Sequence, residues 1–139
     1  MNNESIDSID TEPSWGKLSI SYWLALLVGL ALIGLGVNGL IQPSVAAEAF
    51  GLPLSSSLDS GYVRVKAGRD LIVGAAAIIF VFLKMKKPFS IFCYVGAGMP
   101  LIDGILVLTQ HGGQWIYSLQ HFITALFILF VAYLVGRTP

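Results

Sequence analysis

The chain has 139 residues, of which 55% are hydrophobic and only 12% are charged, and its mean hydropathy is +0.78. Soluble domains carry about 25% charged residues, so this composition disfavours a cytosolic enzyme, a nucleic-acid binder and a disordered adaptor. The eight basic and eight acidic residues cancel, and no net field recruits polyanions. The single cysteine, Cys93, excludes an internal disulfide and a multi-cysteine metal site, and no cofactor is indicated. We therefore expect a single-domain integral membrane protein.

The apolar segments define the predicted fold. Four runs are long enough to cross a hydrocarbon core, which takes about 20 helical residues; they cover residues 22–41, 62–83, 88–108 and 115–136. The first run is uncharged, whereas the second carries charges in its first third. The sequence predicts an all-α bundle of four transmembrane helices over residues 20–139. Residues 1–19 are polar and acidic, and we expect them to form a disordered cytoplasmic tail.

The distribution of Lys and Arg predicts the orientation of the chain in the cell membrane. The basic residues that flank the runs are Lys17, Lys84, Lys86, Lys87 and Arg137. In a chain with four spans these positions share one side, so both termini are expected to be cytoplasmic. The remaining basic residues, Arg64, Lys66 and Arg69, lie within or against the second run and count less as loop charges.

The segment between the first two runs, residues 42–60, contains a predicted short helix. Pro43 favours a helix start, and Gly51 and Pro53 end the helix after Phe50. Its underside is apolar, so we expect it to lie in the membrane interface. A simple connector is the favoured interpretation, and a lid is the alternative.

Polar side chains within the runs fall at similar depths. With a rise of about 1.5 Å per residue, Asp70 lies roughly 4 Å outside the middle of its span, Asp103 and His121 roughly 7 Å, and Asn38 roughly 10 Å. Arg69 is level with Asp70. The complete set in the outer half comprises Asn38, Lys66, Arg69, Asp70, Asp103 and His121.

Charges in hydrocarbon cost at least about 2.5–3.5 kcal/mol each on insertion scales. The ionisable side chains Arg69, Asp70, Asp103 and His121 are therefore expected to face the bundle interior or a water-filled cavity. Asp70 shares a helical face with Gly74, and His121 shares one with Ala125, which allows close helix approach below the charged layer. Pro100 lacks an N–H group and predicts a kink one turn below Asp103. Together these features predict a polar pocket that is open toward the outside and sealed toward the inside.

Several functions fit such a pocket. The favoured one is binding of a small hydrophobic or amphipathic molecule; Arg69 would hold an anionic head through two N–H groups, with Asn38 and Lys66 beside it. In an acid/base enzyme of the isomerase, cyclase or epoxide-opening type, the catalytic residues would be Asp70, Asp103 and His121.

Other interpretations are a small proton-coupled transporter, for which a homodimer is expected, and a purely structural network that pairs Lys66 with Asp70 and Arg69 with Asp103. A metal site formed by Asp70, Asp103, His111 and His121 is disfavoured by the basic neighbours.

Four stretches also carry a family resemblance: Phe50-Gly51-Leu52-Pro53, Val65-Lys66-Ala67-Gly68-Arg69-Asp70 with Gly74, Asp103 ahead of His111-Gly112-Gly113, and His121 with Thr124-Ala125. In these the chain resembles the domain of unknown function 4267 family of small membrane proteins, over roughly residues 24–136. The resemblance implies four membrane helices and involves the same polar residues. It implies no particular activity.

Overall fold

The computed structural model describes residues 15–110 and 115–138. All regular secondary structure in these residues is helical, which confirms the predicted all-α class. The elements are α1 (Ile20–Ile41), α2 (Pro43–Phe50), the 3-10 turn η1 (Ser57–Asp59), α3 (Ser60–Phe82), α4 (Lys86–Gly96), α5 (Gly98–Thr109) and α6 (Trp115–Arg137).

Three segments within the described residues are long and apolar enough to cross a membrane: α1, the continuous stretch Lys86–Thr109 that contains α4 and α5, and α6. Helix α3 has 23 residues, as many as α6. It is more polar because Arg64, Lys66, Arg69 and Asp70 lie in its first half. The fourth predicted span therefore stays a prediction.

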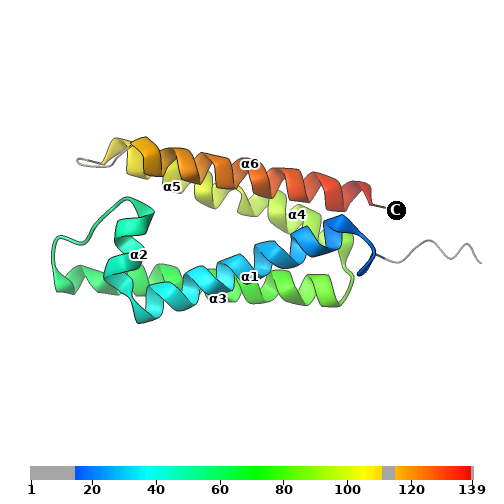
Figure 1. Cartoon of the computed structure of the whole chain (residues 1–139), viewed down its shortest axis with the longest axis horizontal. Helices are drawn as coiled ribbons and strands as arrows, with labels where there is room; N and C mark the ends of the chain where they lie inside the picture. The colour runs from blue at the N-terminus through cyan, green and yellow to red at the C-terminus, as the bar shows by residue number, and fades with distance from the viewer. Residues whose placement is uncertain (1–14, 111–114, 139) are drawn as a thin grey trace, which may run out of the picture.

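The helices form two antiparallel pairs (Figure 1). One pair is α1 with α3, and the other is α6 with α4 and α5. The pairs converge at one end, which we call the basic end because Lys17, Lys84, Lys86, Lys87 and Arg137 lie there. They diverge at the opposite end, where α2 crosses from the first pair toward the second; we call this the α2 end.

Glycines bring α1 and α3 into close contact. A Cβ atom added to Gly74 would lie 2.8 Å from the carbonyl oxygen of Gly29 and 2.9 Å from the backbone nitrogen of Ile33. A Cβ atom added to Gly36 would lie 2.7 Å from the carbonyl oxygen of Ala67. Small residues at these positions let the two backbones approach, as is common between membrane helices. The first helix pair is therefore a tightly packed unit.

The hydrophobic core lies at the basic end and joins the two pairs. Trp15 is only 2% exposed, and its ring contacts those of Tyr22 and Phe89 at centroid distances of 5.6 and 5.9 Å. The Trp15 indole donates a hydrogen bond to Ser21 Oγ (3.0 Å), and Ser21 Oγ is hydrogen-bonded to Thr138 Oγ1 (2.8 Å). These contacts close the basic end. Residues 15–19 of the predicted tail thus lead into the bundle, whereas residues 1–14 lie outside the described residues.

The two local breaks predicted from proline and glycine are present. Helix α2 begins at Pro43 and ends at Phe50, followed by Gly51 with a φ of 97°. This left-handed conformation favours glycine. The third predicted run is divided where α4 ends at Gly96 and α5 begins at Gly98, because Pro100 has no N–H group to offer the carbonyl of Gly96.

Candidate functional site

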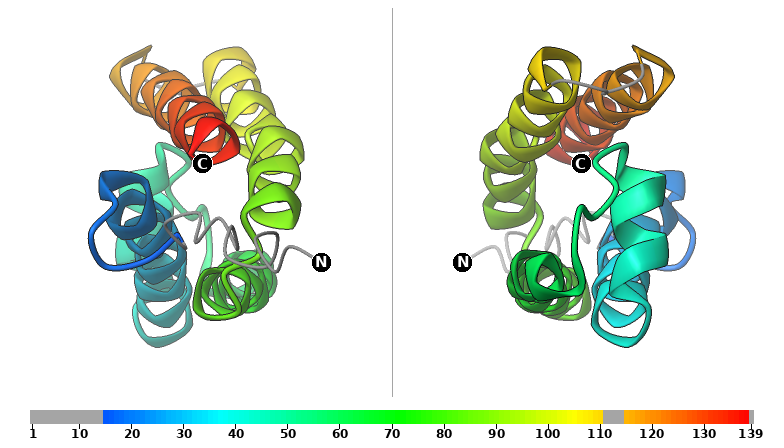
Figure 2. Two further views of the ribbon diagram at one scale, coloured as in Figure 1. Left: turned by 90° about the vertical axis from the view of Figure 1, so that its right-hand side faces the viewer. Right: turned by 90° about the vertical axis from the view of Figure 1, so that its left-hand side faces the viewer.

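A cavity of about 1090 Å³ lies between the two helix pairs. Its wall includes residues of α1, α2, α3, α4, α5 and α6 and of the segment that joins α2 to α3. Viewed from the α2 end, α2 runs from α1 toward α6 on one side of the bundle, and this segment returns from there to α3 (Figure 2). The volume slightly exceeds the roughly 300–1,000 Å³ that is typical of small-molecule sites.

The polar residues of the cavity wall gather at one end. At the α2 end, the wall contains Asn38, Lys66, Asp70, Asp103, Gln120, His121 and Thr124, together with apolar residues such as Leu35, Leu54 and Val63. Nearer the basic end, it contains Val28, Leu32, Val73, Phe92 and Ile128. On α1, on α3, on α4–α5 and on α6, the polar side chains of the wall lie toward the α2 end. The cavity is therefore amphipathic, with its polar part beside α2.

Five of the six predicted site residues line this cavity: Asn38, Lys66, Asp70, Asp103 and His121. Arg69 does not line it, and its side chain is exposed. Successive residues of a helix are rotated by about 100°, so Arg69 does not share the buried face of Asp70. The expectation that Arg69 faces the interior is thus not met.

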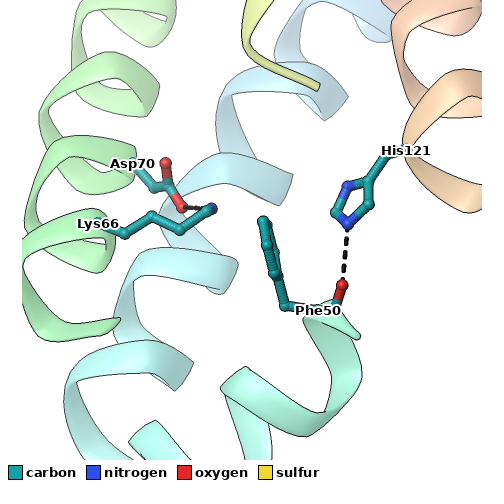
Figure 3. Close-up of polar contacts among 4 residues, drawn as sticks. All are labelled: Phe50, Lys66, Asp70 and His121. Carbon is teal, nitrogen blue, oxygen red and sulfur yellow. Dashed lines mark hydrogen bonds and ion pairs between the residues drawn. The ribbon is translucent and has the colours of Figure 1, made fainter. Parts of the chain in front are cut away.

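Lys66 and Asp70 form an ion pair across one turn of α3. Their Nζ and Oδ2 atoms lie 2.8 Å apart (Figure 3), and the side chains are 31% and 11% exposed. This was one of the two pairs in the structural alternative. The other, between Arg69 and Asp103, does not form among the described residues.

Helix α6 binds the C-terminal end of α2. His121 donates a hydrogen bond from Nε2 to the carbonyl oxygen of Phe50 (3.0 Å; Figure 3), and Gln120 Nε2 donates one to the carbonyl oxygen of Ala49 (2.8 Å). The last carbonyls of a helix lack partners within the helix, so these side chains supply them. The bond to Phe50 also requires a proton on Nε2 of His121.

The Phe50 side chain lies between the two helix pairs. Its ring centroid is 4.5 Å from that of His121 on α6, and Lys66 Nζ on α3 lies 5.1 Å from the Phe50 ring centroid. The latter is a cation–π contact. Phe50 therefore connects α3 to α6 beside the polar part of the cavity.

The roles of Phe50 and Gln120 were not predicted from the sequence. Phe50 belongs to the Phe-Gly-Leu-Pro stretch that carries the family resemblance. Its place in that stretch could have marked Phe50 as a candidate site residue. Gln120 gave none, because a surface glutamine next to a histidine does not reveal which backbone carbonyl will approach it. Helix α2 is held by α6 beside the polar part of the cavity, and both the connector and the lid interpretation stay predictions.

Metal binding finds no support in the described part of the chain. No group of three or more His, Cys, Asp or Glu side chains in residues 15–110 and 115–138 is arranged to hold a metal ion. His111, the fourth residue of the metal site considered from the sequence, lies outside the described residues.

His121→Phe tests the attachment of α2. The substitution keeps an aromatic ring but removes the hydrogen bond to Phe50, which contributes about 0.5–1.5 kcal/mol. We expect amide hydrogen exchange in residues 43–54 to accelerate by up to roughly tenfold, while exchange in α4 stays unchanged. Equal acceleration in α4 would mean that His121 supports the whole bundle rather than α2.

The fold and the cavity define a helical protein with three segments able to cross a membrane and an amphipathic cavity between two helix pairs. Residues 29–135 match the family described as Domain of unknown function (DUF4267), and the chain belongs to that family. The match extends from α1 to α6 and includes every residue that brings α2 onto α6. Comparison with curated proteins and with solved structures gives no significant match.

Proposed function

We propose that this chain is a multi-pass protein of the cell membrane that binds one small amphipathic, lipid-like molecule in the cavity between its helix pairs. The polar head of the ligand lies beside α2, and its apolar tail points toward the basic end. In this proposal α3 is a fourth span, both termini are cytoplasmic, and the α2 end faces outward.

The packing of α3 supports a fourth span. Its 23 residues correspond to roughly 34 Å of helix, which is enough to cross a hydrocarbon core of about 30 Å. It runs antiparallel to α1 and touches it through Gly29, Gly36 and Gly74. If α1 crosses the membrane, α3 has to return along it. The partly buried ion pair between Lys66 and Asp70 reduces the contact of two of its charges with lipid.

The basic end supports a cytoplasmic position for both termini, because cytoplasmic loops carry an excess of Lys and Arg. Reporter fusions after residue 139 and within residues 55–59 are expected to report opposite sides of the membrane, with the fusion after residue 139 inside. Signals from the same side would contradict the topology and the proposed role of α3.

One observation carries the binding proposal: on every long helix that lines the cavity, the polar side chains of the wall lie toward the α2 end and the wall nearer the basic end is apolar. Water fills a polar cavity readily, but an apolar chamber continuous with a polar one matches a molecule with a head and a tail. The closed core around Trp15 and Phe89 at the basic end limits the depth that a tail can reach. A molecule therefore enters from the membrane or from the α2 end.

Filling the cavity tests the proposal. Gly96 lines the cavity, and an added Cβ atom there meets no atom within 4 Å. Gly98 is equally open but does not line the cavity, which makes it a matched control. In native mass spectrometry of protein purified in mild detergent, we expect a co-purified amphiphile on the wild type and on Gly98→Leu, and its loss from Gly96→Leu. Equal occupancy in the two variants, or no bound amphiphile on the wild type, would reject the proposal.

A further inference from the structure

The charges on the cavity wall differ from those expected from the sequence. From the sequence, Arg69 was expected to hold an anionic head, with Lys66 beside it. In the structure Arg64 and Arg69 are exposed and do not line the cavity. The charged residues that do line it are one lysine and three carboxylates: Lys66, Asp59, Asp70 and Asp103. The wall is therefore acidic.

Two of these carboxylates have partners within the chain. Asp70 is paired with Lys66 at 2.8 Å, and Asp59 Oδ2 accepts a hydrogen bond from the backbone N–H of Ser56 at 2.9 Å. Asp103 differs from both. Among the described residues, it forms neither a hydrogen bond nor an ion pair, although it is only partly exposed. Lys66 and His121 attract its negative charge without bonding to it, and a charge held partly away from water is further stabilised by a direct partner.

We infer that the ligand head is a cation, an amine or a quaternary ammonium group, and that it pairs with Asp103. This inference rests on the proposed function and specifies the chemical class of its ligand. An anionic head would meet three carboxylates and one ammonium group, and that ammonium already binds Asp70. A cationic head supplies the direct partner that Asp103 lacks and leaves the pair between Lys66 and Asp70 intact.

The surroundings of Asp103 are consistent with such a head. Asn38 adds a neutral amide to the wall. The aromatic ring of Phe50, also in the wall, already accepts one cation on its face, with Lys66 Nζ at 5.1 Å. Aromatic faces attract alkylammonium groups as they attract lysine. The polar part of the cavity thus combines an unpaired carboxylate with an aromatic surface.

Three probes with the same tail and different heads test the inference: dodecyltrimethylammonium, dodecanoate and dodecanol. Each is titrated into the full-length protein in maltoside micelles, and the apparent melting temperature gives its affinity. We expect the cation to bind most tightly to the wild type. Asp103→Asn is expected to weaken binding of the cation about tenfold, equivalent to roughly 1.4 kcal/mol, and to leave dodecanol unaffected.

Two further variants keep the test decisive. Asp103→Glu retains the charge and is expected to retain the preference for the cation. A preference that is lost in Asp103→Asn but kept in Asp103→Glu would then depend on the charge and not on a folding defect at this position. Glu48 is an exposed acidic residue of α2 that does not line the cavity, and Glu48→Gln is expected to bind all three probes as the wild type does.

The outcomes separate the inference from the proposed function. Dodecanoate binding as tightly as the cation, or an unchanged preference in Asp103→Asn, would overturn the cationic head while leaving an amphiphile site. Stabilisation by none of the three probes would overturn the proposed function as well.

Discussion

Gly74→Ala is expected to lower the free energy of unfolding by roughly 1–3 kcal/mol, the usual cost of inserting a methyl group into a well-packed contact. The new Cβ atom would lie 2.8 Å from the carbonyl oxygen of Gly29 and 2.9 Å from the backbone nitrogen of Ile33. Both are backbone atoms of α1, so no side-chain rotation relieves the clash and the two helices have to separate.

Gly34→Ala is the matched control on α1. An added Cβ atom at Gly34 meets nothing within 4 Å, and we expect a change within about 0.5 kcal/mol. Unfolding by sodium dodecyl sulfate in mixed micelles, followed by circular dichroism, measures both variants. Equal stabilities for Gly74→Ala and Gly34→Ala would mean that α1 and α3 do not pack as closely as described.

Lys66→Met is expected to destabilise the bundle by roughly 2–3 kcal/mol. Breaking a fully buried pair costs about 3–5 kcal/mol because a charge is left unpaired, and the value is lower here because the Lys66 side chain is 31% exposed. Asp70, whose residue exposure is only 8%, would keep its charge with no partner on α3.

Neutralising Asp70 is expected to reverse most of this loss. The double variant Lys66→Met/Asp70→Asn removes both charges, so its stability in the same titration is predicted to lie closer to the wild type than that of Lys66→Met alone. Additive losses in the double-mutant cycle would show that the two side chains are not coupled, which would contradict the ion pair.

Local breaks in the helices were predictable because they depend on single residues. Pro43 and Gly51 set the two ends of α2, and Pro100 set the division between α4 and α5. Burial of Gly74 beside Asp70 and of Ala125 beside His121 also followed from helical periodicity. These features are determined within one helix, and no knowledge of its neighbours was required.

The rotation of each helix relative to its neighbours was not predictable in the same way. The predicted depth in the membrane grouped Arg69 with Asp70. Adjacent residues of a helix point about 100° apart, however, and only Asp70 is buried. The sign of the charge in the cavity therefore depends on rotation and not on depth. The hydrogen bond from His121 to Phe50 is similarly tertiary, since it joins residues 71 positions apart.

Photolabelling tests the central claim, binding of an amphiphile between the helix pairs, most directly. The probe is a neutral long-chain alcohol with a diazirine in its tail, so the result does not depend on the charge of the head. Peptide mapping is expected to locate labels on the apolar cavity wall of both pairs, at Val28 and Leu32 of α1 and at Ile128 of α6. Excess unlabelled dodecanol should remove these labels. Labels confined to exposed positions such as Leu30, Ile72 and Phe130, and insensitive to dodecanol, would contradict the claim.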